Sequence, residues 1–118
     1  MININDFVKE LTKIGLTFSV GVPDSLFKNL CFSFEYSFKK NHSVSANEGS
    51  AIGLGIGYHL STNKIPIIYM QNSGLGNSIN PLISLADNKV YSIPLFLIIG
   101  WRCEKNKKFI DEPQHRTQ

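Results

Sequence analysis

A nearly continuous apolar run over residues 65–71 constrains the fold more than any other stretch of the sequence. Such a run is typical of a parallel strand that is buried on both of its faces. Residues 94–99 have the same character and predict a second buried strand, with Pro94 at its first residue, where proline is tolerated. Shorter runs predict two more strands, over residues 17–20 and 43–46.

Apolar residues at helical spacing occupy the segments that separate these strands. The first helix has Asn3 or Asn5 as its N-cap and Gly15 as its stop. The second follows a turn in which Asp24 or Ser25 can act as the cap. The predicted helices cover residues 4–14, 26–38, 48–59 and 79–86.

This alternation of helices and strands predicts an α/β fold, a three-layer domain with a mostly parallel sheet flanked by helices. Pro81 falls in the first turn of the last helix, where proline is well tolerated. Ligands of such sheets gather at the carboxyl ends of the strands. Four marked stretches lie at those ends: residues 21–25, 47–48, 71–77 and 101–115. Their convergence favours a binding site, although loops and polar residues ordinarily occur at strand ends as well.

The third predicted helix carries four glycines, Gly49, Gly53, Gly55 and Gly57. Each glycine inside a helix costs about 0.5–1 kcal/mol relative to alanine. Gly49, Gly53 and Gly57 are spaced four residues apart and therefore share one face. Either the helix packs closely on its own sheet, or the bare face admits another backbone or a flat ligand. We expect this face to pack against another domain or subunit.

The segment over residues 72–77 lacks the third glycine of a dinucleotide-binding fingerprint, so we reject that interpretation. It still offers small residues and backbone N–H groups at a helix N-terminus, which suits a polar or anionic ligand. Glu48 stands at the start of the preceding helix, where a carboxylate complements the helix dipole.

Several motifs carry a resemblance to a known family. The run Asn47-Glu48-Gly49, followed by the sequence GYHL at residues 57–60, resembles the pyrimidine-binding domain of thiamine-diphosphate-dependent decarboxylases. Three further stretches narrow the resemblance to the decarboxylases of phosphonopyruvate, with those of sulfopyruvate as near relatives. They are GVPDS at residues 21–25, YMQNSGLGN at 69–77, and IGWR at 99–102 followed by DEPQH at 111–115. The resemblance covers nearly the whole chain and is most specific over residues 70–77.

The resemblance implies a chemistry for Glu48. In the family, the matching glutamate hydrogen-bonds N1′ of the cofactor's aminopyrimidine and so promotes formation of the thiazolium ylid that attacks a 2-keto acid. The implied reaction converts 3-phosphonopyruvate to phosphonoacetaldehyde and carbon dioxide, with thiamine diphosphate and Mg²⁺ as cofactors. Two alternatives are a sulfopyruvate decarboxylase subunit of the alpha type and a non-catalytic α/β binding or assembly module. The expected cofactor-binding residues are Glu48, Asn72, Ser73, Gly74, Leu75 and Asn77.

Further residues are candidates for contact with the substrate. His115 can exchange protons near neutral pH, and related decarboxylases place a histidine there, facing the substrate; alternatively it is a surface residue of a frayed end. Arg102 has a guanidinium suited to a phosphonate, and Gln114 is expected beside the substrate. A surface arginine is the competing interpretation of Arg102. Asp24 is either a catalytic residue or only a helix cap.

No metal site is predicted within this chain. Asp111 and Glu112 are acidic neighbours of His115, but Pro113 interrupts any helix that would align them. The family binds its diphosphate and Mg²⁺ through a Gly-Asp-Gly motif with a downstream Asn, and the chain contains no match. Residues 1–118 are therefore expected to be an incomplete pyrimidine-binding domain, inactive alone. The diphosphate-binding domain would follow in a longer polypeptide or be supplied by a partner subunit. The protein is expected to be a homo-oligomer or to bind such a partner subunit.

Composition excludes several other classes. The net charge of +3 is too small to argue for nucleic acid as a partner. The longest apolar run is far too short to span a bilayer, and the polar N-terminus does not resemble a secretory signal. Cys31 and Cys103 lack metal-like spacing and are read as free thiols. These features favour a cytoplasmic protein.

Overall fold

Four parallel strands form a single sheet in the computed structural model, which describes residues 2–101. In spatial order they are β2 (His42–Val44), β1 (Ser19–Gly21), β3 (Ile67–Gln71) and β4 (Phe96–Gly100). Ser19 pairs with both His42 and Ile67, and Ile67 pairs with Phe96 on its other side. The predicted parallel sheet is confirmed, and all four carboxyl ends lie at one edge.

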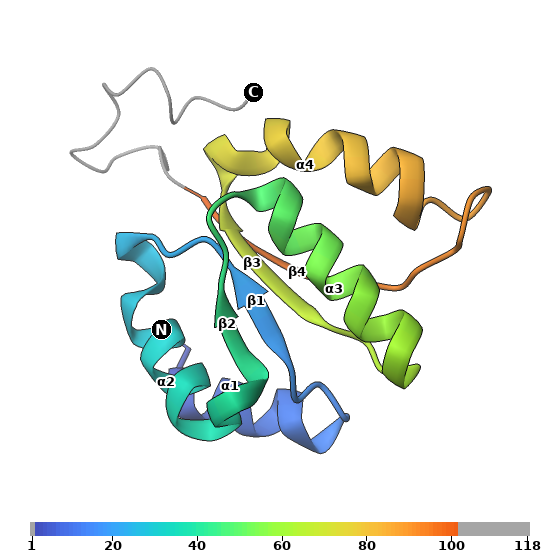
Figure 1. Ribbon diagram of the computed structural model, residues 1–118. Helices are drawn as coiled ribbons and strands as arrows, with labels where there is room; N and C mark the ends of the chain where they lie inside the picture. Colours follow the sequence, from blue (N-terminus) through green and yellow to red (C-terminus); the bar gives the residue numbers. More distant parts are fainter. Residues whose placement is uncertain (1, 102–118) are drawn as a thin grey trace.

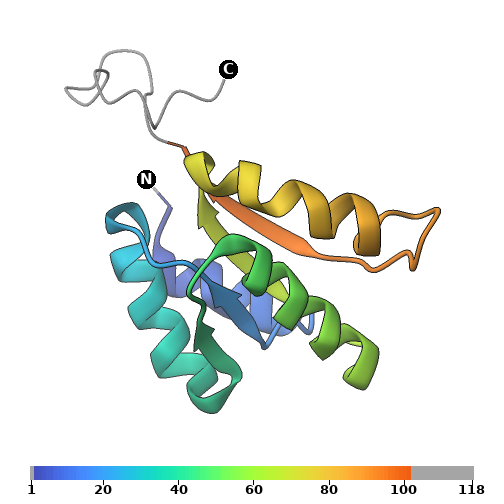
Figure 2. The same cartoon turned by 45° about the horizontal axis from the view of Figure 1, so that its top comes forward.

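Helices cover both faces of this sheet, as Figures 1 and 2 show. Helices α1 (Ile4–Lys13) and α2 (Lys28–Phe38) lie on one face. Helices α3 (Glu48–Thr62) and α4 (Leu75–Pro81) lie on the other. Short turns join them: the 3₁₀ turns η1 (Ser25–Phe27), η2 (Lys39–Asn41) and η3 (Asn72–Gly74), and the π-helical turn η4 (Leu82–Ala86). The three-layer α/β architecture is confirmed.

Strand β3 supplies side chains to both hydrophobic cores. Ile67 and Tyr69 pack with the apolar residues of α1 and α2. Ile68 and Met70, which point to the opposite face because side chains alternate along a strand, pack with those of α3. All four side chains are fully buried, as a doubly covered parallel strand requires.

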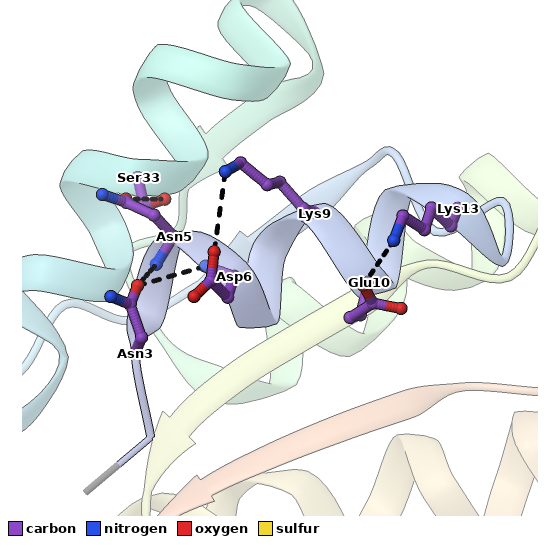
Figure 3. Close-up of polar contacts among 7 residues, drawn as sticks. All are labelled: Asn3, Asn5, Asp6, Lys9, Glu10, Lys13 and Ser33. Atoms are coloured by element: carbon purple, nitrogen blue, oxygen red, sulfur yellow. Dashed lines mark hydrogen bonds and ion pairs between the residues drawn. The ribbon is translucent and has the colours of Figure 1, made fainter.

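Asn3, one of the two candidate caps, is the N-cap of α1. The side chain of Asn3 accepts hydrogen bonds from the backbone N–H groups of Asn5 and Asp6, at 3.0 and 3.2 Å (Figure 3). Asn5 instead lies inside the helix, where its side-chain oxygen accepts a hydrogen bond of 3.1 Å from Ser33 of α2. Gly15, with a φ of 89°, follows the helix in the left-handed region that glycine adopts readily.

Two predicted elements were wrong in detail. Residues 94–99 are not a fully buried strand, because β4 starts at Phe96, lies at the edge of the described sheet and leaves Leu97 36% exposed. Pro81 is not in the first turn of its helix either. The helix starts at Leu75 directly after η3, so Pro81 is its last residue, and the chain continues as a π-helical turn. A proline lacks the N–H that would extend the regular ladder.

A partly buried polar pair joins β1 and β2 beside the core. The hydroxyl of Ser19, fully buried, lies 2.9 Å from Nδ1 of His42. The His42 ring stacks on Tyr69, with ring centroids 5.9 Å apart. Burial lowers the pKa of His42 below its ordinary value of 6.5, and the negative charge of Glu35 opposes this effect. The neutral imidazole is therefore the form that the fold favours.

We predict that acid destabilises the domain through His42. Because the folded pKa lies below the unfolded one, the unfolded chain binds more protons as the pH falls. The contribution of this group is fully present above pH 6.5 and is lost below it, with a slope of at most about 1.4 kcal/mol per pH unit for one proton. Urea denaturation between pH 7.5 and 5 measures this. His42→Gln should flatten the dependence, whereas His59→Gln, at the surface end of α3, should retain it; equal slopes in both variants would contradict the assignment.

Candidate functional site

Ser45 and Asn47, which lie shortly before Glu48 in the sequence, fix the start of α3 through polar contacts. Asn47 has an extended backbone, and its side-chain oxygen accepts a hydrogen bond of 2.9 Å from the N–H of Ser50. The hydroxyl of Ser45 donates to the carbonyl oxygen of Asn47 at 2.9 Å. Glu48 is thus the first helical residue, as predicted, and its carboxylate lies at the positive end of the helix dipole.

The Glu48 side chain reaches across to the segment that follows β3. The side-chain amide of Asn77 donates a hydrogen bond of 2.9 Å to Oε2 of Glu48. The carboxylate also lies directly against Gly74, because a Cβ built on Gly74 would overlap it. The helices α3 and α4 begin at the same end of the sheet, beside the carboxyl end of β3 (Figures 1 and 2). Glu48, Gly74 and Asn77 therefore form one cluster from two segments of the chain.

The segment beneath this carboxylate is anchored in the interior. Asn72 is fully buried at the end of β3. The Ser78 hydroxyl, also buried, lies 3.1 Å from Sδ of Met70 and 3.4 Å from the carbonyl oxygen of Gly74. Leu75 packs against the core beneath α3. Ser78 was not among the predicted site residues. The sequence does carry a signal for it, because a serine inside a helix can donate its hydroxyl to the backbone carbonyl four residues earlier, which here is Gly74.

The four glycines of α3 divide into two groups, those that pack within this chain and those that do not. A Cβ on Gly49 would lie 3.0 Å from the backbone carbonyl oxygen of Asn77, so Gly49 belongs to the first group. A Cβ on Gly55 would lie 2.7 Å from the Ile68 side chain, so Gly55 allows the helix to sit closely on β3. Gly53 and Gly57 are exposed, and a Cβ on either would meet no atom within 4 Å. Close packing on the sheet thus explains Gly55, while the exposed pair forms an uncovered face among the described residues.

The structure brings together some of the predicted residues and leaves others apart. Glu48, Gly74 and Asn77 are in contact. Asn72 and Ser73 lie in η3, which joins β3 to α4, and Leu75 is the first residue of α4. Asp24 caps η1, accepting from the N–H groups of Ser25 and Leu26, so its capping role is confirmed and a catalytic role stays a prediction. Arg102, Gln114 and His115 lie outside the described residues.

Residues 2–101 contain neither a metal-binding cluster nor a membrane-spanning helix. No cluster of three or more His, Cys, Asp or Glu side chains there could hold a metal ion. Within the same range, every helix is too short or too polar to cross a bilayer.

The chain is similar to curated decarboxylases. It is 35% identical over 115 residues to phosphonopyruvate decarboxylase from Streptomyces hygroscopicus, and 36% identical to that from Streptomyces viridochromogenes; each match covers 98% of this chain. Over 100 residues, or 85% of the chain, it is 35% identical to sulfopyruvate decarboxylase subunit alpha from Methanococcus maripaludis. The chain spans 27–28% of the length of the two Streptomyces relatives and 58% of the Methanococcus relative.

Solved structures share the fold. A putative thiamin diphosphate-dependent enzyme from Mycobacterium smegmatis superposes with a TM-score of 0.74 at 22% identity, over 98% of this chain and 22% of its own. Benzoylformate decarboxylase from Polynucleobacter necessarius superposes with a TM-score of 0.66 at 24% identity, over 86% of this chain and 19% of its own.

Residues 4–118 also match the family described as thiamine pyrophosphate enzyme, N-terminal TPP binding domain. The match extends over almost the entire chain, and the relatives and the fold agree with it. The chain therefore belongs to the thiamine pyrophosphate enzymes, as their N-terminal TPP binding domain.

Proposed function

We propose that the protein containing this chain is a thiamine-diphosphate-dependent decarboxylase that converts 3-phosphonopyruvate to phosphonoacetaldehyde and carbon dioxide. The observation that carries the proposal is the Glu48 carboxylate, held at the start of α3 against the bare backbone of Gly74. Two relatives named phosphonopyruvate decarboxylase, each matched over 98% of this chain, support the choice of substrate.

The residues present fit the aminopyrimidine of thiamine diphosphate. One oxygen of Glu48 accepts from Asn77, and within residues 2–101 the other accepts no hydrogen bond. That second oxygen can hold or share a proton with a ring nitrogen. Gly74 has no side chain, and the Glu48 carboxylate occupies the space that a Cβ on Gly74 would take. When bound, the cofactor supplies the carbanion and the electron sink for the loss of carbon dioxide.

Substrate contacts are proposed for three residues that follow β4 in the sequence and for one residue after β1. Arg102 would pair with the anionic head of the substrate, since a guanidinium matches phosphonate oxygens in a bidentate geometry. His115 would exchange a proton with the reacting group, and Gln114 would hydrogen-bond the substrate beside it. Asp24, on the loop after β1, would serve as a further catalytic group.

A second candidate substrate is sulfopyruvate. It is favoured by relatives named sulfopyruvate decarboxylase subunit alpha, of which this chain covers 50–58%. Both substrates are 2-keto acids with an anionic head. Steady-state turnover of each by the complete enzyme would separate them.

We propose that Mg²⁺ and the cofactor's diphosphate are held by a second domain or a partner subunit. The name "subunit alpha" of the relatives from Methanococcus maripaludis and Methanocaldococcus jannaschii implies a partner for those proteins. In this chain the exposed Gly53 and Gly57 of α3 offer a face on which such a partner can approach closely.

We predict that Glu48→Gln in the complete enzyme lowers turnover by about 10²-fold or more, because it removes the ionisable group while keeping size and hydrogen bonding. If the carboxylate only stabilises the start of the helix, its replacement should lower the free energy of unfolding by a few tenths to about 1 kcal/mol and leave turnover nearly intact. Steady-state decarboxylation of phosphonopyruvate at saturating thiamine diphosphate and Mg²⁺, beside thermal melting, measures both. The same amide replacement at the exposed Glu10 is the control and should leave turnover intact. Near-normal turnover in Glu48→Gln would favour the non-catalytic assembly module.

A second prediction concerns assembly. Gly53→Leu places a bulky side chain on the exposed face of α3 and should weaken the association of the complete enzyme by at least about 10-fold, while the domain stays folded because no atom lies within 4 Å of the new Cβ. Light scattering after size-exclusion chromatography over a dilution series measures the association. Ser37→Leu, which adds the same side chain to an exposed position of α2, is the matched control. An unchanged oligomer in Gly53→Leu would show that this face is not an interface.

A further inference from the structure

The contact between Asn77 and Glu48 assigns different roles to the two oxygens of the carboxylate. The Asn77 amide donates to Oε2 at 2.9 Å, across a separation of 29 residues in sequence. Oε1 is the oxygen nearest to the Cβ position of Gly74. We propose that Asn77 is a positioning residue, which holds Oε2 of Glu48 and thereby fixes the orientation in which Oε1, beside Gly74, is offered to the ligand. This inference rests on the proposed function, because only a bound aminopyrimidine would give Glu48 a ring nitrogen with which to form a hydrogen bond.

The chemistry of the two groups gives the hydrogen bond a fixed direction. An ionised carboxylate can only accept, so the NH₂ end of the Asn77 amide must face Glu48. Hydrogen bonds to a charged group are shorter and stronger than neutral ones. A glutamate side chain has three rotatable bonds, and a bond to one oxygen restricts the orientation of the other. The amide can therefore orient the carboxylate without contributing a charge of its own.

Two glycines allow the two helix starts to come this close. A Cβ on Gly74 would overlap the Glu48 carboxylate. A Cβ on Gly49 would lie 3.0 Å from the backbone carbonyl oxygen of Asn77. Both helices thus approach each other where a larger residue would separate them, and the Asn77–Glu48 bond spans the resulting contact.

The competing explanation is that Asn77 only ties α4 to α3. Asn80, one helical turn further along α4, provides a matched control, because its side chain also makes a hydrogen bond, accepting from Ser84 at 2.8 Å, but does not contact Glu48. Asn77→Asp and Asn80→Asp are the same chemical change on the same helix. Only the first places a second carboxylate against Glu48.

The first measurement is thermal melting of the complete protein without cofactor. Asn77→Asp should lower the melting temperature more than Asn80→Asp, because two carboxylates then face each other. In a Glu48→Gln background this difference should disappear, since a glutamine amide can donate to the new carboxylate. Equal shifts of the two variants in both backgrounds would overturn the contact, whatever the activity of the protein.

The second measurement is decarboxylation of phosphonopyruvate at saturating thiamine diphosphate and Mg²⁺. Asn77→Ala should lower kcat by about 10-fold or more with little change in the KM for phosphonopyruvate, because a misplaced carboxylate impairs the reacting geometry. Asn77→Gln, which keeps the donor, should recover part of this loss, and Asn80→Ala should turn over normally. A lower melting temperature with unchanged kcat in Asn77→Ala would overturn the positioning role. A complete protein that turns over neither 2-keto acid would overturn the proposed function instead, and the melting comparison would still decide the contact.

Discussion

The burial of β3 on both faces is the constraint on which the rest of the described structure depends. Ile67, Ile68, Tyr69 and Met70 are fully buried, alternately against one helical layer and the other. Burying a side chain of this size contributes about 1.5–3 kcal/mol, so this strand joins the two layers energetically as well as geometrically. The segment that follows β3 carries Gly74 and Asn77, so the strand also determines where the carboxylate of Glu48 can rest.

Features encoded within a short stretch of sequence were predictable. The apolar run of β3 predicts a doubly buried strand because its composition leaves no polar face. The position of Glu48 predicts a carboxylate at the start of a helix, and that helix begins at Glu48. The cap that Asn47 supplies was not predicted. Features that depend on distant partners were harder to predict. Strand β1 starts at Ser19, where its pairing with His42 and Ile67 begins, and this register is invisible in the local sequence.

The errors have the same origin. The apolar run before Gly100 predicts burial, but the position of β4 at the edge of the described sheet follows from strand order, which the run itself does not encode. At the site, the segment of Gly74 and Asn77 was predicted to bind the cofactor. Its hydrogen bond to Glu48 was not predicted, because it joins residues 29 apart in the sequence and depends on how the two helices pack. The roles of Arg102, Gln114 and His115 remain predictions, because these residues lie outside the described range.

The glycine content of α3 has a consequence for how the carboxylate keeps its place. A helix with this many glycines has low intrinsic stability, because each one costs about 0.5–1 kcal/mol relative to alanine. Its order must therefore come from its surroundings, chiefly the tight seat of Gly55 on Ile68 and the contact of Gly49 with α4. The position of the proposed acid–base group thus depends on tertiary packing. A substitution that loosens the core would therefore displace the Glu48 carboxylate even where the domain remains folded.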